Sequence, residues 1–408
     1  MFSRKTFALL LTHYLGSNSR SSAVLALGTI LNSLLGLAFY TLVLRNLTLA
    51  DFGYFSYILG IGVLAAGLGD LGFGASIIKF GHSEKFRQVF TVAISEALII
   101  SALFFLLALV GELIFQAGLI NSALIAFSLL TLSMVTQSFL AKQKYYHFVI
   151  TNICGNAVRI ALALLAVFSG ILSPQNALLI FTLANFSALI IGLAFLFILE
   201  GGWLISFRDF SLNVVTAMKF SSWLGGSYLL STIVNKIDIP LVYALAGPAA
   251  TGIYSSAQKL SSVFPQLVAS VEGVFTPKFS RDKEITKSFK DYLWITAGLV
   301  ALLILAMLLS PFVINLLFGQ KYAGAVGIFV LLLIGMVFFS LAGPYTAKVV
   351  YYLGRTDLHL LSSVLQLFLG VILYFLLIPP LGADGAAITF IAVNIFLWLF
   401  FWFISRDR

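Results

Sequence analysis

Three basic side chains, Arg159, Lys236 and Lys259, lie inside long apolar stretches of this 408-residue chain. They outnumber the carboxylates at similar depth, Asp238 and the shallower Glu96. A charge within a bilayer costs about 2.5–3.5 kcal/mol even on the most lenient scale, so it usually faces the protein interior or water. Because guanidinium and ammonium groups bind phosphates, the pattern predicts a basic cavity for an anionic cargo such as a phosphate or pyrophosphate headgroup.

The depth of these charges follows from the rise of a helix, about 1.5 Å per residue. Asp238 lies ten residues before Pro248 and Lys259 eleven residues after it, which puts both about 15 Å from the outer surface. Arg159 lies twelve residues after His147, about 18 Å from the inner surface. All three are therefore predicted near the membrane midplane.

Polar side chains accompany these charges at steps of three and four residues, which places each set on one helix face. One hydrated cavity would explain the sets from three spans, whereas polar contacts between helices, with Asp238 paired to Lys259, are the alternative. Lys236 is two residues from Asp238 and points to nearly the opposite side, so either it or the Asp238 face lines the cavity. The polar residues predicted to line the cavity are Asn152, Asn156, Asn235, Ser255, Ser262 and Gln266.

The segment Gly67-Leu68-Gly69-Asp70 matches the GxGD signature of intramembrane aspartyl proteases. Such an enzyme needs a second aspartate at the same depth, and Asp238, the other deep aspartate, is predicted to lie higher in the membrane. Asp70 falls near the inner end of its span, and with Asp238 and Glu96 it is a candidate for ion coupling or charge pairing. The histidines are scattered, and the sequence contains no HExxH, P-loop or nucleophile elbow, so we expect no enzyme, no metal site and no cofactor.

The elements that must position these residues are membrane-spanning helices. The chain is 61% hydrophobic and 10% charged, whereas soluble proteins carry about 25% charged residues. A span needs about 20 apolar residues, and no alternating run resembles a barrel strand, so we expect an all-α polytopic membrane protein. The twelve predicted spans are 21–45, 51–79, 88–112, 118–141, 147–170, 177–200, 217–246, 251–276, 291–317, 323–353, 357–378 and 384–404.

The net charge of +9 is explained by topology rather than by nucleic-acid binding. Of the 24 Lys and Arg residues, 18 fall in the even-numbered loops and the termini, four lie within spans, and two, Arg45 and Lys321, lie in the odd-numbered loops. Basic loops stay on the cytoplasmic side, so this bias predicts that both termini are cytoplasmic. Attraction to anionic membrane lipids would be a side effect, and no nucleic-acid partner is expected.

The twelve spans divide into two halves, an N-lobe over residues 1–205 and a C-lobe over residues 206–408. Gly53 and Gly252 stand in similar turns 199 residues apart, and Ala177–Asn185 resembles Ala386–Asn394 at an offset near 209. Each half has an even number of helices, so the repeats run in the same direction. Transporters built in this way bind substrate between the halves and rock to alternate access. The many glycines of the second span permit close packing or bending.

Several motifs together resemble those of the polysaccharide-type flippases, which belong to the superfamily of the multidrug and toxic-compound extruders and the lipid II flippase. The resemblance begins in the turn after the first span and continues over nearly the whole chain, in the order and spacing of the family. The motifs are Leu44–Leu47 with Asp51–Gly53, Asp70–Gly72, Ile237–Ile239 with Gly252–Leu260, Leu317–Tyr322, and Ile378–Ala387.

The resemblance implies two pseudo-symmetric six-helix bundles that form a V around a central cavity. It implies a multi-pass protein of the cytoplasmic (inner) membrane that flips undecaprenyl-pyrophosphate-linked oligosaccharide repeat units, such as O-antigen or capsule units, to the outer leaflet. Its partners would be that lipid-linked oligosaccharide, membrane lipids, a coupling ion (H+ or Na+) and a polysaccharide polymerase. By chemistry and depth, Arg159, Lys236 and Lys259 are the candidates for the family's cationic cavity residues.

A multidrug or cation antiporter of the same superfamily is the alternative function. Such extruders usually place a carboxylate in the first helix, and residues 21–44 contain no Asp or Glu. A lipid II flippase of the fourteen-helix type would need two further helices. An intramembrane enzyme would need polar catalytic groups that converge at one depth. An assembly partner that does not transport would tolerate neutral residues in place of the midplane charges.

Overall fold

A computed structural model describes residues 19–406 except 82, 84, 116–117, 203, 207–214, 216–225, 227–228, 231 and 282–284. The regular structure in this part of the chain is helical, as the sequence predicts. The first group of helices is α2 (Ser19–Asn46), α3 (Leu49–Gly69), α4 (Phe73–Phe80), α5 (Phe86–Phe115), α6 (Leu119–Ala141), α7 (Tyr145–Phe168) and α8 (Pro174–Glu200). The second group is α10 (Asp238–Ser261), α11 (Val263–Arg281), α12 (Thr286–Phe318), α13 (Ala325–Ala347), α14 (Thr356–Leu381) and α15 (Ala383–Arg406), with short turns η1 (Gln320–Tyr322) before α13 and η2 (Lys348–Tyr352) after it.

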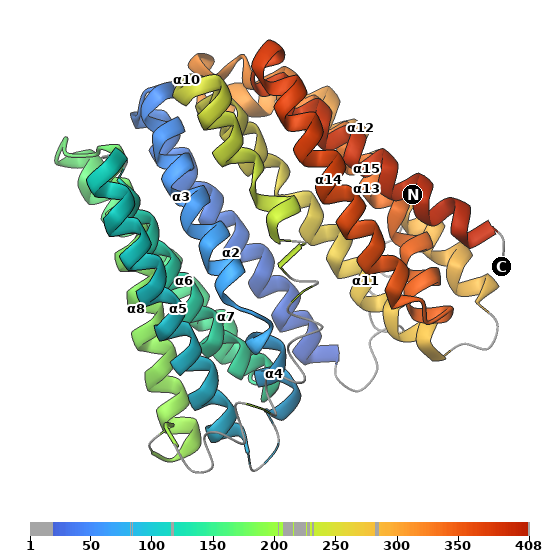
Figure 1. Cartoon of the computed structure of the whole chain (residues 1–408), viewed down its shortest axis with the longest axis horizontal. Helices are drawn as coiled ribbons and strands as arrows, with labels where there is room; N and C mark the ends of the chain where they lie inside the picture. Colours follow the sequence, from blue (N-terminus) through green and yellow to red (C-terminus); the bar gives the residue numbers. More distant parts are fainter. Residues whose placement is uncertain are drawn as a thin grey trace.

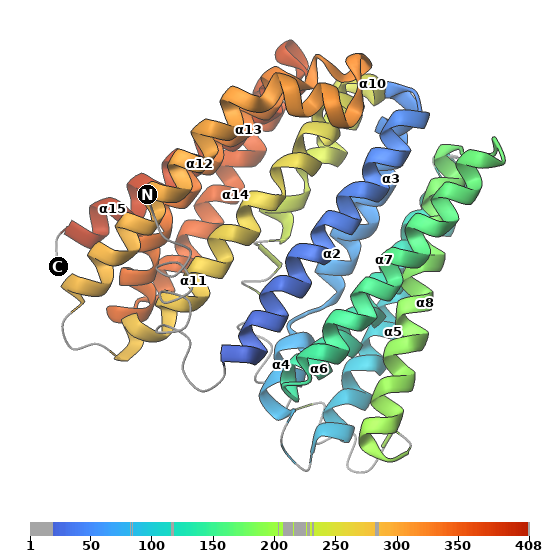
Figure 2. The same ribbon diagram turned by 180° about the vertical axis from the view of Figure 1, so that it is seen from behind.

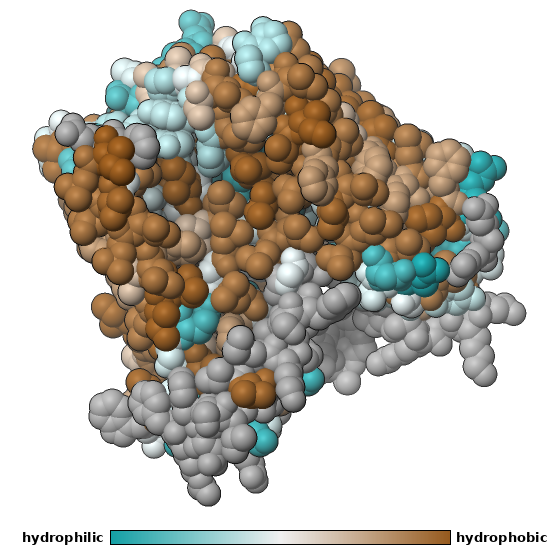
Figure 3. All heavy atoms as spheres, in the orientation of Figure 1, coloured by the Kyte–Doolittle hydropathy of each residue, from teal (hydrophilic) through white to brown (hydrophobic). Residues whose placement is uncertain are grey.

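The two groups of helices form two bundles that meet at one end and diverge toward the other (Figures 1 and 2). Helices α3 and α10 lie together where the bundles meet, whereas α4 lies at the diverging end. Following the positive-inside prediction, we call the meeting end the outer end and the diverging end the inner end. The face shown in Figure 3 is covered mainly by apolar side chains, as a surface in contact with lipid must be.

Eleven helices in the described part of the chain are long and apolar enough to cross a membrane. Ten of them correspond to single predicted spans, and the other, Thr232–Ala269, covers parts of two, 217–246 and 251–276. The two spans are separated at Gly247, whose φ of 84° and ψ of 175° interrupt α10 at the outer end. Pro248 begins the next turn of helix, where its missing N–H would have no partner in any case.

The prediction of one unbroken span over 51–79 is wrong, because the chain leaves the helical conformation after α3. Leu71 and Gly72 have φ values of 43° and 82°, and two left-handed residues end a right-handed helix. At this break the Asp70 Oδ1 accepts a hydrogen bond of 3.0 Å from the N–H of Gly74, in the first turn of α4. Asp70 therefore satisfies one of the free N–H groups with which every helix begins.

Three glycines of α3 form the surface on which the second bundle packs. Gly53, Gly60 and Gly67 are spaced by seven residues, which is close to two helical turns and places them on one face. A Cβ atom at Gly60 would lie 3.3 Å from the Ile239 side chain, and one at Gly67 would lie 2.5 Å from that of Thr232. The absence of side chains therefore lets the two bundles approach closely, as small residues do between membrane helices.

The closest approach is a reciprocal contact at the outer end. A Cβ atom at Gly53 would lie 1.8 Å from the carbonyl oxygen of Pro248, and one at Gly252 would lie 2.1 Å from the carbonyl oxygen of Leu49. Gly53 thus packs on the carbonyl four residues before Gly252, and Gly252 packs on the carbonyl four residues before Gly53. The two positions that the sequence matched as repeats therefore make equivalent contacts, as a two-fold relation between the bundles requires.

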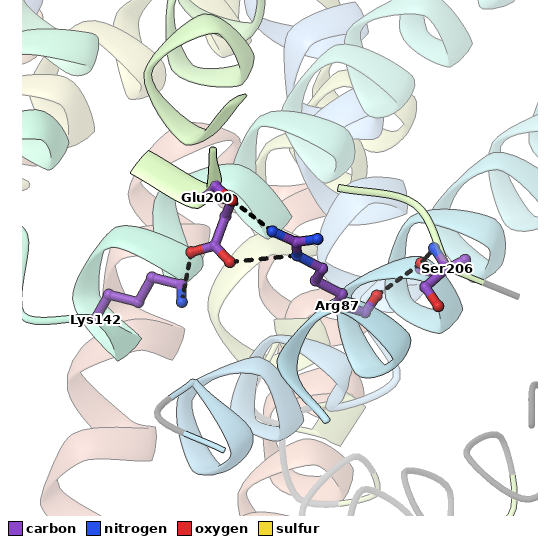
Figure 4. Close-up of polar contacts among 5 residues, drawn as sticks. Arg87, Lys142, Glu200 and Ser206 are labelled. Atoms are coloured by element: carbon purple, nitrogen blue, oxygen red, sulfur yellow. Dashed lines mark hydrogen bonds and ion pairs between the residues drawn. The ribbon is translucent and has the colours of Figure 1, made fainter. Parts of the chain in front are cut away.

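The chain that leaves the first bundle stays attached to it at the inner end (Figure 4). Glu200 pairs with Lys142 at 2.7 Å and with Arg87 at 3.6 Å, and its carbonyl oxygen also accepts a hydrogen bond from Arg87. The N–H of Ser206 donates to the Thr91 hydroxyl at 2.8 Å. These contacts join α5, α6 and α8, and they hold residues 204–206 against α5.

Gly53→Ala is expected to destabilise the folded protein, because the added methyl group would overlap the backbone of Pro248. Overpacking of this kind typically costs about 1–3 kcal/mol. The loss should be measurable as a lower midpoint in thermal unfolding of the detergent-solubilised protein. The matched control is Gly298→Ala in α12, since no described atom lies within 4 Å of its added Cβ. Equal midpoints for the two variants would contradict the contact.

Candidate functional site

Arg159 of α7 is held in the first bundle by neutral groups. Its Nη1 donates to the Asn156 Oδ1 and its Nη2 donates to the Asn185 Oδ1, both at 2.8 Å. The guanidinium carbon lies 4.1 Å from the centre of the Phe181 ring and 5.6 Å from that of Phe39. The ion pairs found among the described residues do not include Arg159. Its positive charge is therefore bound by dipoles and aromatic faces, and the described residues supply no carboxylate to compensate it.

The two asparagines are themselves oriented by residues of other helices. The Asn156 Nδ2 donates to the Asn32 Oδ1 of α2 at 2.6 Å, and the Asn185 Nδ2 donates to the Ser128 hydroxyl of α6 at 3.2 Å. Because each amide nitrogen is engaged in this way, each amide oxygen is directed to Arg159. The network joins α2, α6, α7 and α8, so four helices fix the position of one guanidinium.

Arg159 keeps donor capacity beyond these contacts. A guanidinium carries five N–H donors in a planar fork. The Nε of Arg159 is buried and has no hydrogen-bond partner in the described structure, although the residue as a whole is half-buried. A buried unpaired donor is costly, and costlier still on a charged group. An anionic ligand beside the guanidinium would compensate its charge.

The two lysines of the predicted cationic site lie on the second bundle. Lys236, just before α10, is exposed, and Lys259 of α10 is half-buried. The Lys259 Nζ lies 4.6 Å from the centre of the Tyr40 ring, which belongs to α2 of the first bundle. A cation at this distance from an aromatic face is attracted by the ring. Lys259 therefore already contacts the bundle that holds Arg159.

Asp238 does not form the predicted pair with Lys259 among the described ion pairs. Its carboxylate is buried and accepts hydrogen bonds from the Tyr254 hydroxyl at 2.8 Å, from the Ile239 N–H at 2.9 Å and from the Gln258 amide. Asp238 thus ties together the two halves of α10 on either side of Gly247. Asp238 is therefore enclosed, whereas Lys236, just before α10, is exposed.

Only some of the polar residues predicted to line the cavity are exposed. Ser255 is fully buried, with no partner for its hydroxyl among the described atoms, so it belongs to the packing between helices and not to a cavity wall. Asn235 and Ser262 are exposed, whereas Asn152 is half-buried and donates to the Phe148 carbonyl of its own helix. Gln266 is exposed and accepts a 2.5 Å hydrogen bond from Ser33 of α2, which crosses between the bundles.

Glu96 and Asp70 form a separate acidic centre toward the inner end of the first bundle. Both carboxylate oxygens of Glu96 are buried without a hydrogen-bond partner in the described structure, as is the Gln137 Oε1. A Cβ atom at Gly74 would lie 3.1 Å from the Asp70 Oδ1 and 3.5 Å from the Gln137 side chain, so Asp70 is a neighbour of Gln137. Asp70 also caps α4, so its position is fixed by the break between α3 and α4. Two carboxyl groups in such surroundings are suited to share a proton or a cation.

A cavity of about 330 Å³ lies inside the second bundle, and Asn235, one of the residues predicted to line a cavity, is part of its wall. Its wall includes Glu272, His359, Gln366 and Asn394, which come from α11, α14 and α15. Helix α14 alone contributes His359, Ser362, Ser363 and Gln366, which are spaced by three and four residues and so form one polar stripe. A second signal is that Asn394 occupies the place in the repeat that Asn185 occupies beside Arg159.

Asn185→Ala should weaken the folded state, because the Arg159 Nη2 loses its acceptor inside the bundle. Leaving a buried donor unpaired costs about 1–3 kcal/mol, and more when the group is charged. Ser187→Ala on the same helix is the control, since Ser187 donates to the carbonyl of Ala184 at 2.7 Å within its own helix. Thermal unfolding of the two purified variants compares them. A midpoint for Asn185→Ala no lower than that of the control would argue against the network.

The family comparison matches residues 19–283 to the family described as polysaccharide biosynthesis protein. A curated relative, the capsular polysaccharide biosynthesis protein CapF of Staphylococcus aureus, is 27% identical over 199 residues, which are 46% of this chain. The alignment covers 48% of that relative, so this chain spans about half the length of the curated protein that it matches.

Solved structures share the fold over nearly the whole chain. The lipid II flippase MurJ in an inward closed conformation has a TM-score of 0.71 and 17% identity, over 94% of this chain and 87% of that one. An inward-facing multidrug resistance MATE family transporter has a TM-score of 0.69 and 16% identity, over 92% and 94% of the two chains. A MOP superfamily transporter from Pyrococcus furiosus has a TM-score of 0.66 and 16% identity, over 95% and 94%. These likenesses establish the transporter fold, and because the family model covers more than half of the sequence, the chain belongs to the polysaccharide biosynthesis protein family.

Proposed function

We propose that this protein flips undecaprenyl-pyrophosphate-linked oligosaccharide repeat units from the inner to the outer leaflet by alternating access. The observation that carries the proposal is the charge of Arg159, which neutral side chains from four helices hold inside the first bundle with no ion pair to a described carboxylate. Membership of a polysaccharide biosynthesis family and a fold shared with transporters support the same conclusion.

The pyrophosphate and the sugars of such a lipid cannot cross a bilayer unaided, because charges and unpaired hydroxyl groups are costly in the hydrocarbon core. The polyprenyl chain is soluble there. Arg159 would attract the pyrophosphate through the charge of its guanidinium, and Lys236 and Lys259 would supply charge from the second bundle. Because the cations lie on both bundles, a bound pyrophosphate would contact both and would feel their relative movement.

The transport cycle is proposed to use a proton or sodium gradient, with Glu96 and Asp70 as the coupling groups. Glu96 is favoured because its buried carboxylate has no hydrogen-bond partner in the described structure. Asp238 is less suited, since three donors already engage its carboxylate. The proposal places the protein in the inner membrane with both termini cytoplasmic, where a polysaccharide polymerase on the outer side would use the flipped units.

Arg159→Ala is expected to reduce flipping at least tenfold, because the pyrophosphate loses its charged partner, while Lys259→Ala gives a smaller loss. The assay is leaflet-resolved translocation of undecaprenyl-pyrophosphate-oligosaccharide in proteoliposomes. Arg355→Ala is the control, as Arg355 forms an exposed ion pair with Asp357 at 2.8 Å. Normal flipping by Arg159→Ala would refute the cationic site. If the same vesicles transported organic cations, and Arg159→Ala did not reduce that transport, the result would instead support a drug antiporter.

Glu96→Gln should keep the fold, because the amide has nearly the same shape as the carboxyl group. It should remove the response to an ion gradient, because the amide carries no charge with which to bind a proton or a sodium ion. The measurement is flipping in vesicles with and without an imposed proton or sodium gradient. Glu112→Gln is the control, since Glu112 is acidic on the same helix but caps α6 through the N–H of Leu119 at 2.7 Å. A Glu96→Gln variant that still responds to the gradient would exclude Glu96 as the coupling group.

A further inference from the structure

Two cations at the outer end reach from one bundle to the other. Arg45, at the end of α2, donates through Nε to the Leu317 carbonyl at 2.8 Å and through Nη2 to the Leu316 carbonyl. Lys321, in η1 of the second bundle, donates to the carbonyls of Arg45 at 2.8 Å and Leu47 at 2.7 Å. The two side chains therefore cross in opposite directions between the same pair of helix ends.

The acceptors of both cations are carbonyls at the C-terminal ends of helices. Leu316 and Leu317 lie in the last turn of α12, while Arg45 and Leu47 lie at the end of α2. Carbonyls in these positions lack partners within their own helix and carry the negative end of the helix dipole. Each cation thus caps a helix of the opposite bundle, and these caps exist only while the outer ends of the bundles are together.

An apolar contact lies beside the two cations. The ring of Phe52 in α3 meets the ring of Tyr322 edge-on at 6.2 Å, and Tyr322 is fully buried. Arg45 and Lys321 themselves are exposed. The closed outer end therefore has a packed interior of aromatic and glycine contacts, with hydrogen bonds from two charged residues at its rim.

The charge distribution of the sequence gives these residues a second distinction. Arg45 and Lys321 are the two basic residues of the odd-numbered loops, on the side where the positive-inside bias disfavours them. Neither takes part in the ion pairs found among the described residues, so neither is bound to a carboxylate in that part of the chain. Both instead bind the backbone of the opposite bundle.

We propose that Arg45 and Lys321 form an outer latch, a pair of interbundle helix caps that stabilises the conformation closed at the outer end. Opening of the outer end requires both cations to leave the helix carbonyls for water. The latch goes beyond the proposed function, because it concerns the balance between two conformations and applies whatever the cargo is. It can therefore be tested in the absence of substrate.

The test measures distances between spin labels in the full-length protein in lipid nanodiscs. The labels replace exposed residues in a background where Cys154, the one native cysteine, is changed to Ser. One pair, at 169 and 384, reports on the outer end, and the other, at 144 and 356, reports on the inner end. In the double variant Arg45→Gln/Lys321→Gln, we expect more molecules than in the unaltered protein to have the outer pair of labels further apart. In the same molecules the inner pair should be closer together. The ratio of outward-open to inward-open molecules should rise on the order of tenfold, the size expected for losing hydrogen bonds from charged groups.

The control is Asn46→Ala, next to Arg45. The Asn46 amide donates to the Leu42 carbonyl at 2.8 Å within its own helix, so its loss should leave both distances unchanged. Distances in the double variant that match those of the control would overturn the latch. If the double variant does not fold, Arg45→Gln and Lys321→Gln are measured singly, and each should give a smaller shift of the same sign. No shift in either would also overturn the proposal.

Discussion

The close approach of α3 and α10 at the outer end is the contact on which the arrangement of the two bundles depends. Gly53 and Gly252 bring backbone against backbone, and no larger residue fits at either position without movement of a helix. Inside a membrane the hydrophobic effect does not press helices together, so association relies on van der Waals contact and hydrogen bonds. The glycine pair supplies the van der Waals contact, and Arg45 and Lys321 supply hydrogen bonds at the rim of the outer end.

The second bundle and the first differ in how they treat buried charge. In α10, Asp238 is saturated by three donors and binds two helix segments together, which is a structural use of a carboxylate. In α7, Arg159 is positioned just as firmly, yet its charge is left without a carboxylate among the described residues. Positioning without neutralisation is what a binding group needs, because the ligand then supplies the missing charge.

The sequence predicted the helices well, because a chain in lipid must satisfy its backbone within each apolar segment. It also identified Arg159, Lys236 and Lys259 as deep or membrane-embedded charges, although their role stays a prediction. It did not predict the break after α3, since nothing in Asp70-Leu71-Gly72 shows that Leu71 adopts a left-handed conformation. Helical spacing assigned Ser255 to a polar face but could not tell which neighbour covers that face. Asn185 was missed as a partner of Arg159 because the contact joins residues from different helices.

The single-residue reversal at Gly247 has a practical consequence for how accessible the outer end of the molecule is. The other connections at the outer end have two residues between α2 and α3, three between α5 and α6, one between α14 and α15, five between α7 and α8, and six, including η1, between α12 and α13. A protease that approaches the outer end would therefore find its longest targets between α7 and α8 and between α12 and α13.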